Sequence, residues 1–252
     1  TITDLYKNKE KSKIVMLTCY TAPIAKILDN HVDILLVGDS LGMTVYGHNN
    51  TLAVTKRMMI DHGKCVVDNS KNALVVIDLP FGSYETDKIR AFDTAAEIIS
   101  KTNAAAVKLE GGKKVIKQIK FLIKNNIAVM GHLGLLPQSS KKFKSKGKTN
   151  KEANQLIKES KLLQECGVFA IVLECVKTSI AKKISQKLNI PTIGIGSSVH
   201  CDGQVLVTDD LIGLNQTKIK FVKQFLNVKK YINTGLRKYA SEVRSKKYPT
   251  KK

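Results

Sequence analysis

Short runs of β-forming residues alternate with longer amphipathic segments along the whole chain, and no other feature constrains the fold as strongly. This alternation is typical of repeated βα units and a parallel sheet. The predicted strands cover residues 14–18, 34–38, 74–78, 105–109, 128–131, 169–174, 192–196 and, weakly, 205–207. The predicted helices cover residues 23–29, 55–69, 88–103, 113–125, 151–166, 179–188 and 218–233. Eight units without an internal break predict a single (β/α)8 TIM barrel over residues 1–252, with a short basic tail from about residue 246.

An open, doubly wound parallel sheet is the alternative fold for such a pattern. That fold usually has a Gly-x-Gly-x-x-Gly turn after its first strand, whereas residues 18–23 contain no glycine. We therefore favour the closed barrel.

The composition is that of a globular protein that needs no disulfides. Hydrophobic residues make up 43% of the 252 residues, and the apolar runs are strand-sized, well below the roughly 20 residues of a membrane span. No apolar segment follows a basic one near residue 1, so we expect no secretory signal. The five cysteines have no Cys-x-x-Cys spacing, which favours reduced thiols and a cytoplasmic location.

The net charge of +21 raises the question of a nucleic-acid partner. The lysines are spread over nearly every predicted helix, and the two densest runs, residues 141–148 and 246–252, lack the aromatic interleaving of a base-stacking surface. We interpret the charge as a compositional bias on solvated faces. A non-enzymatic, basic nucleic-acid-binding protein stays the alternative from another functional class.

Acidic residues follow the apolar part of four predicted strands, and a histidine ends a fifth. They are Asp39, Asp78, Glu110, Glu174 and His132. In a barrel these strand ends meet on one rim, where carboxylates repel each other and raise each other's pKa values unless a cation lies among them. Oxygen ligands of this kind suit Mg²⁺. The sequence therefore predicts a divalent metal site at the carboxyl ends of the strands.

Each of these residues also has a purely structural interpretation. Asp39 or Asp78 alone could cap a helix, and His132 alone could be a buried structural histidine. Lys108 and Glu110 have the same parity within one strand and should share a face, opposite to Leu109, but they could form a structural ion pair.

Several blocks of the sequence resemble the ketopantoate hydroxymethyltransferase family. They include Val37-Gly38-Asp39-Ser40-Leu41-Gly42-Met43, Asp78-Leu79-Pro80-Phe81 and Val107-Lys108-Leu109-Glu110-Gly111-Gly112. Further blocks follow in the family's order at residues 130–135, 137–139, 173–176, 190–196 and 201–204, so that the resemblance spans roughly residues 14–226.

The resemblance implies a (β/α)8 barrel of the phosphoenolpyruvate/pyruvate type that assembles as a homo-oligomer, typically a decamer. It implies transfer of a hydroxymethyl group from 5,10-methylenetetrahydrofolate to 3-methyl-2-oxobutanoate, which gives ketopantoate on the route to pantothenate and coenzyme A. Asp39 and Asp78 would ligate one Mg²⁺ per subunit, with Glu110 near the waters of the metal. Ser40, Lys108 and His132 would bind the oxo acid beside the two metal ligands, and Glu174 matches the proposed base of the family.

Two loops depart from the family pattern, at residues 141–148 and 197–200, and they leave the folate contacts open. A second enzymatic alternative is another Mg²⁺-dependent, enolate-forming barrel of the isocitrate lyase and phosphoenolpyruvate mutase group. That group usually has a Lys-Lys-Cys-Gly-His-like loop, which this sequence lacks.

Overall fold

A computed structural model describes residues 1–9, 11–140, 144–215 and 219–250. The chain divides into two compact units, Thr1–Leu206 and Val207–Lys252, which are described separately. That the whole chain behaves as one domain stays a prediction. In the described ranges no helix combines the length and apolar character that a membrane span needs.

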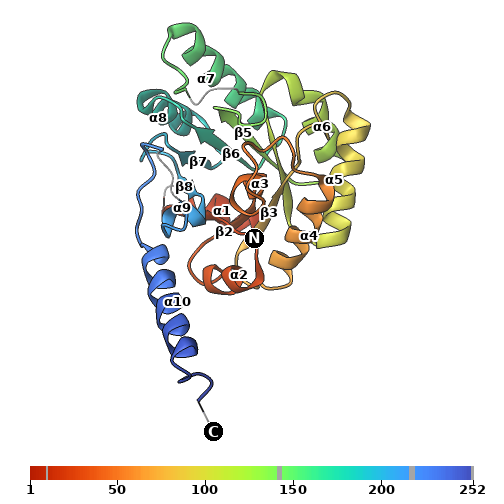
Figure 1. Cartoon of the computed structure of the whole chain (residues 1–252). Helices are drawn as coiled ribbons and strands as arrows, with labels where there is room; N and C mark the ends of the chain where they lie inside the picture. The colour runs from red at the N-terminus through yellow and green to blue at the C-terminus, as the bar shows by residue number, and fades with distance from the viewer. Residues whose placement is uncertain (10, 141–143, 216–218, 251–252) are drawn as a thin grey trace. The chain divides into compact units, whose positions relative to one another are not determined.

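The first unit contains a closed barrel of parallel strands with helices around it (Figure 1). Each strand pairs with the next, and the last pairs back onto the first. The strands are β1 (Ile14–Thr18), β2 (Ile34–Val37), β3 (Leu74–Asp78), β4 (Ala106–Glu110), β5 (Val129–Gly134), β6 (Ala170–Glu174), β7 (Thr192–Ile195) and β8 (Gly203–Leu206). The predicted barrel is thus confirmed, and the doubly wound sheet is wrong.

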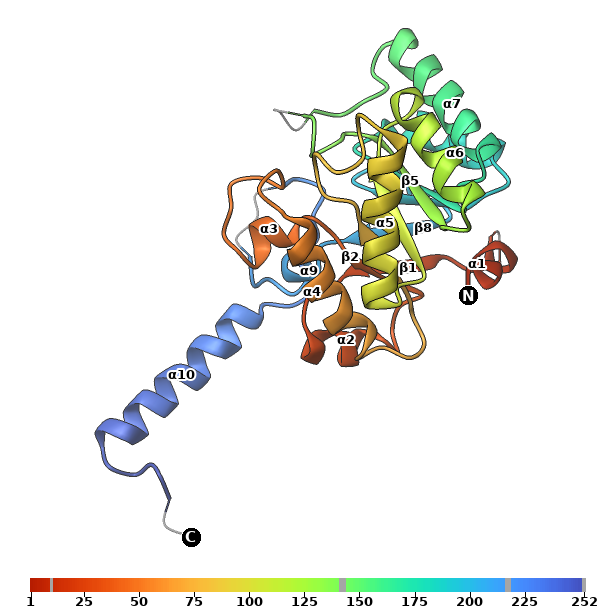
Figure 2. The ribbon, with the colours of Figure 1, turned by 90° about the vertical axis from the view of Figure 1, so that its right-hand side faces the viewer.

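The helices of the barrel unit are α1 (Ile2–Asn8), α2 (Ala22–Leu28), α3 (Leu41–Thr44), α4 (Lys56–Val67), α5 (Lys88–Thr102), α6 (Ile116–Lys124), α7 (Asn150–Glu165) and α8 (Thr178–Lys187), with a 3-10 turn η1 (Lys113–Val115) before α6. Several begin at a side-chain cap, as where Thr55 accepts a hydrogen bond from the Met58 amide at the start of α4. Figure 2 shows α4, α5 and α6 along the outside of the strands, where α5 packs against both of its neighbours.

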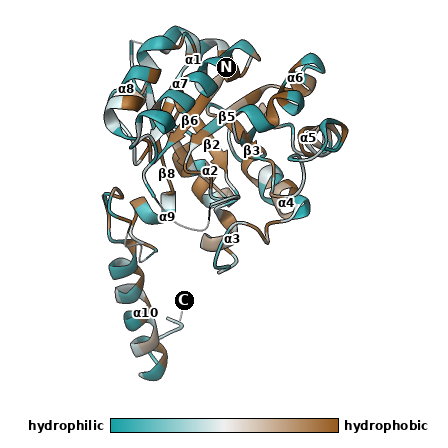
Figure 3. Cartoon of the chain, turned by 90° about the horizontal axis from the view of Figure 1, so that it is seen from above, coloured by the Kyte–Doolittle hydropathy of each residue, from teal (hydrophilic) through white to brown (hydrophobic). Residues whose placement is uncertain are grey.

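Two apolar cores result from the period of two along each strand. Residues such as Leu35, Ile77 and Leu109 point outward and pack under the helices. Leu36, Val76 and other residues of the opposite parity fill the barrel itself, joined by Leu5 of α1. Figure 3 shows mostly hydrophobic residues along the strands and a mixture of hydrophilic and hydrophobic residues along the helices.

The inward-facing rows change from apolar to charged toward the carboxyl ends of the strands. Val76 is followed in its row by Asp78, and Ala106 by Lys108 and Glu110. The same change occurs from Met130 to His132 on β5, and from Ala170 and Val172 to Glu174 on β6. The fold therefore places the charged residues on one rim, as the strand-end pattern predicts.

The second unit contains α9 (Thr208–Leu211) and α10 (Val228–Arg244). The predicted helix over residues 218–233 has the wrong bounds, because the observed helix begins at Val228 and continues to Arg244. Residue 218 itself lies outside the described residues. The amides of Phe225 and Val228 donate to the carbonyls of Leu211 and Ile212, which holds this stretch against the end of α9. The helix begins only after Asn227, whose side chain accepts from the Lys230 amide.

Candidate functional site

The site lies at the rim formed by the carboxyl ends of β2 to β6, and the described structure brings most of the predicted residues into one connected cluster. Asp39 and Ser40 follow β2, Asp78 ends β3, Lys108 and Glu110 lie on β4, His132 lies on β5 and Glu174 ends β6. All are buried except Ser40, which is partly exposed. Leu109 packs outward, so the predicted division between the two faces of β4 is confirmed.

A pair of aspartates and a lysine form one side of the cluster. The Asp39 amide donates to Asp78 Oδ2 over 3.0 Å, and Lys108 Nζ lies 2.9 Å from Asp78 Oδ1. Asp78 and Lys108 are register partners on neighbouring strands, which explains their contact. Gly38 leaves room for this arrangement, because a Cβ there would lie 3.0 Å from Ser40 Oγ and 3.5 Å from Asp78 Oδ2.

His132 lies between two carboxylates on the other side of the cluster. Its Nε2 is 3.3 Å from Glu174 Oε2, and its Nδ1 is 3.6 Å from Glu110 Oε1. Neither contact has hydrogen-bond geometry, and among the described residues no other side chain bonds to the ring. Both nitrogens are therefore available to a bound ligand.

The pKa values indicate that the cluster buries more carboxyl groups than its one cationic side chain can compensate. Burial, followed by repulsion from Asp78, raises the pKa of Asp39 to about 7. Burial raises the pKa of Glu110 to about 9 although Lys108 opposes this shift. Burial alone would lower the pKa of Lys108, but the charges of Asp78, Asp39 and Glu110 outweigh it and raise that pKa. Lys108 therefore stays cationic, and one cation does not compensate the carboxylates around it.

Burial and then the charge of Lys108 lower the pKa of His132 below its ordinary value, even though Glu174 opposes the shift. The ring is therefore neutral near pH 7 and offers one donor and one acceptor nitrogen.

Two further buried residues, which the strand-end pattern did not single out, complete the cluster. Gln138, in the loop after β5, donates from Nε2 to Asp39 Oδ2 over 2.8 Å and from its amide to Glu110 Oε2 over 3.1 Å. The Tyr84 hydroxyl donates to Gln138 Oε1 over 2.6 Å and accepts from the Glu110 amide over 3.1 Å. The only sequence signal for Gln138 was its place in one block of the family resemblance. Periodicity carries no information about a loop residue that bonds to a partner 99 positions away.

Ser40 lies at the edge of the cluster, where its Oγ is 2.7 Å from the hydroxyl of Tyr20, a buried residue two positions after the end of β1. The Tyr20 carbonyl in turn lies 2.7 Å from Nδ1 of His62 on α4. These contacts orient Ser40 from two neighbouring βα units.

The donor set fits a divalent cation that completes its shell with substrate and water. Across the described ranges no three His, Cys, Asp or Glu side chains gather closely enough to hold a metal on their own. Mg²⁺ is commonly held by one or two carboxylates together with ligand oxygens and waters, and the adjacent Asp39 and Asp78 offer such a pair.

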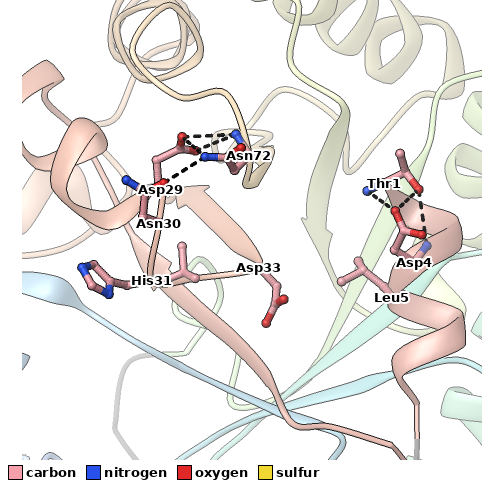
Figure 4. A pocket seen from close by; sticks show the side chains of 9 residues that line it. Thr1, Asp4, Leu5, Asp29, Asn30, His31, Asp33 and Asn72 are labelled. Atoms are coloured by element: carbon pink, nitrogen blue, oxygen red, sulfur yellow. Dashed lines mark hydrogen bonds and ion pairs between the residues drawn. The ribbon is translucent and has the colours of Figure 1, made fainter.

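A separate cavity of about 640 Å³ lies near the amino ends of the strands, and Figure 4 shows its lining. Its carboxylates all accept hydrogen bonds from backbone nitrogens. Asp29 accepts from the amides of residues 71–73, Asp33 from the Val15 amide, and Asp4 from the terminal amino group of Thr1. This lining is structural, so the rim cluster is the candidate site.

Known proteins resemble this chain along nearly its whole length. The family model of ketopantoate hydroxymethyltransferase matches residues 1–251. The 3-methyl-2-oxobutanoate hydroxymethyltransferase of Pelagibacter ubique (strain HTCC1062) is 54% identical over 251 residues, covering 100% of this chain and 97% of its relative. The enzyme of the same name from Phenylobacterium zucineum (strain HLK1) is 45% identical, covering 98% of this chain and 90% of the relative.

Solved structures agree on the fold alone. A 2,3-dimethylmalate lyase of the PEP mutase/isocitrate lyase superfamily aligns with a TM-score of 0.64 at 13% identity, over 98% of this chain and 86% of that one. A phosphonopyruvate hydrolase, solved with oxalate and Mg²⁺, aligns with a TM-score of 0.63 at 8% identity, over 97% and 87%. The family model matches nearly every residue, and the two relatives named above are about half identical over at least 90% of their length. This chain therefore belongs to the ketopantoate hydroxymethyltransferase family.

Proposed function

We propose that this chain transfers a hydroxymethyl group from 5,10-methylenetetrahydrofolate to 3-methyl-2-oxobutanoate through a Mg²⁺-stabilised enolate, and so makes ketopantoate for pantothenate synthesis. The names of its full-length relatives support the reaction. The observation that carries the mechanism is the arrangement of the rim, with an aspartate pair and Lys108 on one side and the Glu110–His132–Glu174 row on the other.

Asp39 and Asp78 would hold the metal, and Glu110 would hold waters of the metal. Their placement on adjacent βα units supports this role, since the Asp39 amide already binds the Asp78 carboxylate. When bound, Mg²⁺ supplies a Lewis acid for the keto oxygen of the substrate, which stabilises the enolate that forms when C3 loses its proton.

Lys108, Ser40 and His132 would bind the oxo acid. Lys108 is buried and cationic, so it attracts the substrate carboxylate into a site that otherwise carries negative charge. The neutral ring of His132 can donate to a substrate oxygen from one nitrogen. The Ser40 hydroxyl, held by Tyr20, is a further donor at the edge of the rim. Together these groups fix the orientation of the substrate before proton removal.

Glu174 would accept the proton from C3. It ends β6, across the rim from the aspartate pair, and its carboxylate contacts His132 without bonding to Asp39 or Asp78 in any described contact. A base on a separate strand can reach the substrate carbon without serving as a metal ligand. Water adds to the one-carbon unit of the folate, which breaks both of its carbon–nitrogen bonds and leaves a proton on each nitrogen. The enolate carbon then attacks the released formaldehyde-level carbon, whose oxygen takes up the proton held by Glu174 and becomes the new hydroxyl group.

We also propose that the chain acts as a homo-oligomer, with a decamer as the expected state. Support comes from α10, where Ile232, Leu236, Tyr239 and Val243 follow a helical spacing along one face. These four side chains stay 42–59% exposed, although Tyr248 packs edge-on against Tyr239. An exposed apolar stripe of this length is typical of a protein–protein contact.

The deciding experiment follows solvent deuterium into C3 of 3-methyl-2-oxobutanoate by NMR, with and without Mg²⁺, before methylenetetrahydrofolate is added. We expect Mg²⁺-dependent exchange, followed by ketopantoate formation once the folate is present. Exchange without product would contradict the folate donor and direct attention to the divergent loops at residues 141–148 and 197–200. A folded, Mg²⁺-loaded protein that exchanges no proton would contradict the proposed substrate.

A further inference from the structure

Gln138 connects three parts of the rim that are distant in sequence. Its side-chain nitrogen donates to Asp39 Oδ2 over 2.8 Å and to the carbonyl of Leu79 over 2.9 Å. Its backbone amide donates to Glu110 Oε2 over 3.1 Å, and its side-chain oxygen accepts from the Tyr84 hydroxyl over 2.6 Å. The side chain of this buried loop residue thus reaches residues that follow β2 and β3, and its backbone amide reaches the last residue of β4.

This set of contacts determines the orientation of the amide. Both hydrogens on Nε2 face acceptors, and Oε1 faces a hydroxyl donor. Exchanging the nitrogen and oxygen would place Oε1 against the Asp39 carboxylate and the Leu79 carbonyl, which are both acceptors. The flipped amide would lose two hydrogen bonds and create two repulsive contacts, so the amide has a single favourable orientation.

The backbone around Gln138 supports the side chain. The Leu135 amide donates to the Glu174 carbonyl over 2.8 Å, and the amides of Ser139 and Ser140 both donate to the Leu136 carbonyl. These bonds form a tight turn whose start is joined to the end of β6. Gln138 is therefore presented to the rim from a fixed backbone.

We propose that Gln138 is a positioning residue that occupies Oδ2 of Asp39 and so presents the other oxygen of that carboxylate to the cation. The inference rests on the proposed metal site. A neutral amide suits this task, because it orients the carboxylate and leaves its negative charge for the metal, whereas a lysine would neutralise that charge. Groups that hydrogen-bond to a metal ligand commonly change metal affinity or activity by about 10- to 100-fold when they are removed.

The test compares Gln138→Met with Gln118→Met. Gln118 on α6 is a second glutamine that is 5% exposed, as Gln138 is, and its side chain donates to the Glu85 carbonyl, away from the carboxylates of the rim. Binding of Mn²⁺ alone is measured by electron paramagnetic resonance on each full-length protein, after circular dichroism has shown that the protein is folded. We expect Gln138→Met to bind Mn²⁺ about 10- to 100-fold more weakly than wild type. Gln118→Met should bind it as wild type does.

A second readout separates positioning from general damage. In the deuterium-exchange assay, Gln138→Met should need more Mg²⁺ for half-maximal exchange, while its exchange rate at saturating Mg²⁺ should stay near that of wild type. Tyr84→Phe removes the hydroxyl that donates to Gln138 Oε1 and accepts from the Glu110 amide. It should shift Mn²⁺ affinity in the same direction and provides a test if Gln138→Met does not fold.

Unchanged Mn²⁺ affinity in both Gln138→Met and Tyr84→Phe would overturn the inference and leave the proposed metal site standing. An equal loss in Gln118→Met would also overturn it, because the effect would then follow from burial alone. Absence of Mn²⁺ binding in wild type would instead remove the metal site, and the inference with it.

Discussion

Lys108 Nζ lies 2.9 Å from Asp78 Oδ1, and both side chains are buried where β3 and β4 reach the rim of the barrel. Lys108 is thus the positive charge in a cluster that contains the carboxylates of Asp78, Asp39 and Glu110. An uncompensated carboxylate in such surroundings is costly, so the lysine contributes to folding as well as to the proposed binding of the oxo acid.

Replacing Lys108 with methionine should therefore destabilise the metal-free protein. Breaking one partner of a buried ion pair commonly costs about 3–5 kcal/mol, because it leaves a buried charge without compensation. Saturating Mg²⁺ should restore more stability to Lys108→Met than it adds to wild type. Urea unfolding with and without Mg²⁺ measures both effects. Lys101→Met, which removes an exposed ion pair with Glu97, is the control and should unfold as wild type does. Equal losses in the two variants would contradict the assigned role of the Lys108–Asp78 pair.

Glu174→Gln and Asp78→Ala should separate proton removal from metal binding. Glu174→Gln keeps the shape of the side chain, so we expect it to bind Mg²⁺ and the oxo acid but to exchange the C3 proton at least about 100-fold more slowly. Asp78→Ala removes a proposed metal ligand and should lose both binding and exchange. Calorimetric titration and NMR exchange measure the two properties, with the exposed Glu165→Gln on α7 as the control. Wild-type exchange in Glu174→Gln would exclude this residue as the base.

Much of the rim could be predicted from sequence because parallel strands bring their carboxyl ends together. The parity within Val107-Lys108-Leu109-Glu110 already assigns the side chains of Lys108 and Glu110 to one face, and the structure confirms that assignment. Gln138 and Tyr84 could not be found in this way. Their contacts depend on the conformation of the loops after β5 and β3, and no periodicity describes such loops.

The fold was predictable for a related reason. Strands buried on both faces produce continuous apolar runs, so β3 was predicted with its observed bounds, Leu74–Asp78. The error over residues 218–233 has a different cause. The pattern there is compatible with a helix, but the backbone near Phe225 bonds to the end of α9, and this contact is invisible to local propensity.

Asp29 lies far from the rim, and its ionisation should make the free energy of unfolding depend on pH in the acid range. Burial alone would raise the pKa of Asp29, but amide donors from Ala73, Lys71 and Asn72 outweigh it and lower that pKa below 3.8. Part of these contacts is visible in Figure 4. Because the folded-state pKa is the lower one, the stabilisation is present above the unfolded-state value and is lost as pH falls through the folded-state value.

We therefore expect the free energy of unfolding of metal-free wild type to fall below about pH 4, and Asp29→Asn to show a shallower fall. At neutral pH, Asp29→Asn should already be less stable by about 1–3 kcal/mol, since one amide oxygen cannot satisfy all the donors that the carboxylate satisfied. Urea unfolding between pH 3 and 7 measures the difference. Asp61→Asn, on the exposed side of α4, is the control and should follow wild type. Parallel pH curves for Asp29→Asn and wild type would contradict the assigned role.

The apolar face of α10 should determine the oligomeric state. A single chain has a mass of 27.8 kDa, and we expect light scattering after size exclusion to give a multiple of this value, ten for the decamer. Leu236→Asp places a charge in the middle of the face and should lower the measured mass, because burying an unpaired carboxylate in an apolar contact is costly. Thr234→Asp makes the same change of charge roughly 200° away around the helix and should leave the mass unchanged. A monomeric wild type, or equal dissociation of both variants, would show that this face does not hold the subunits together.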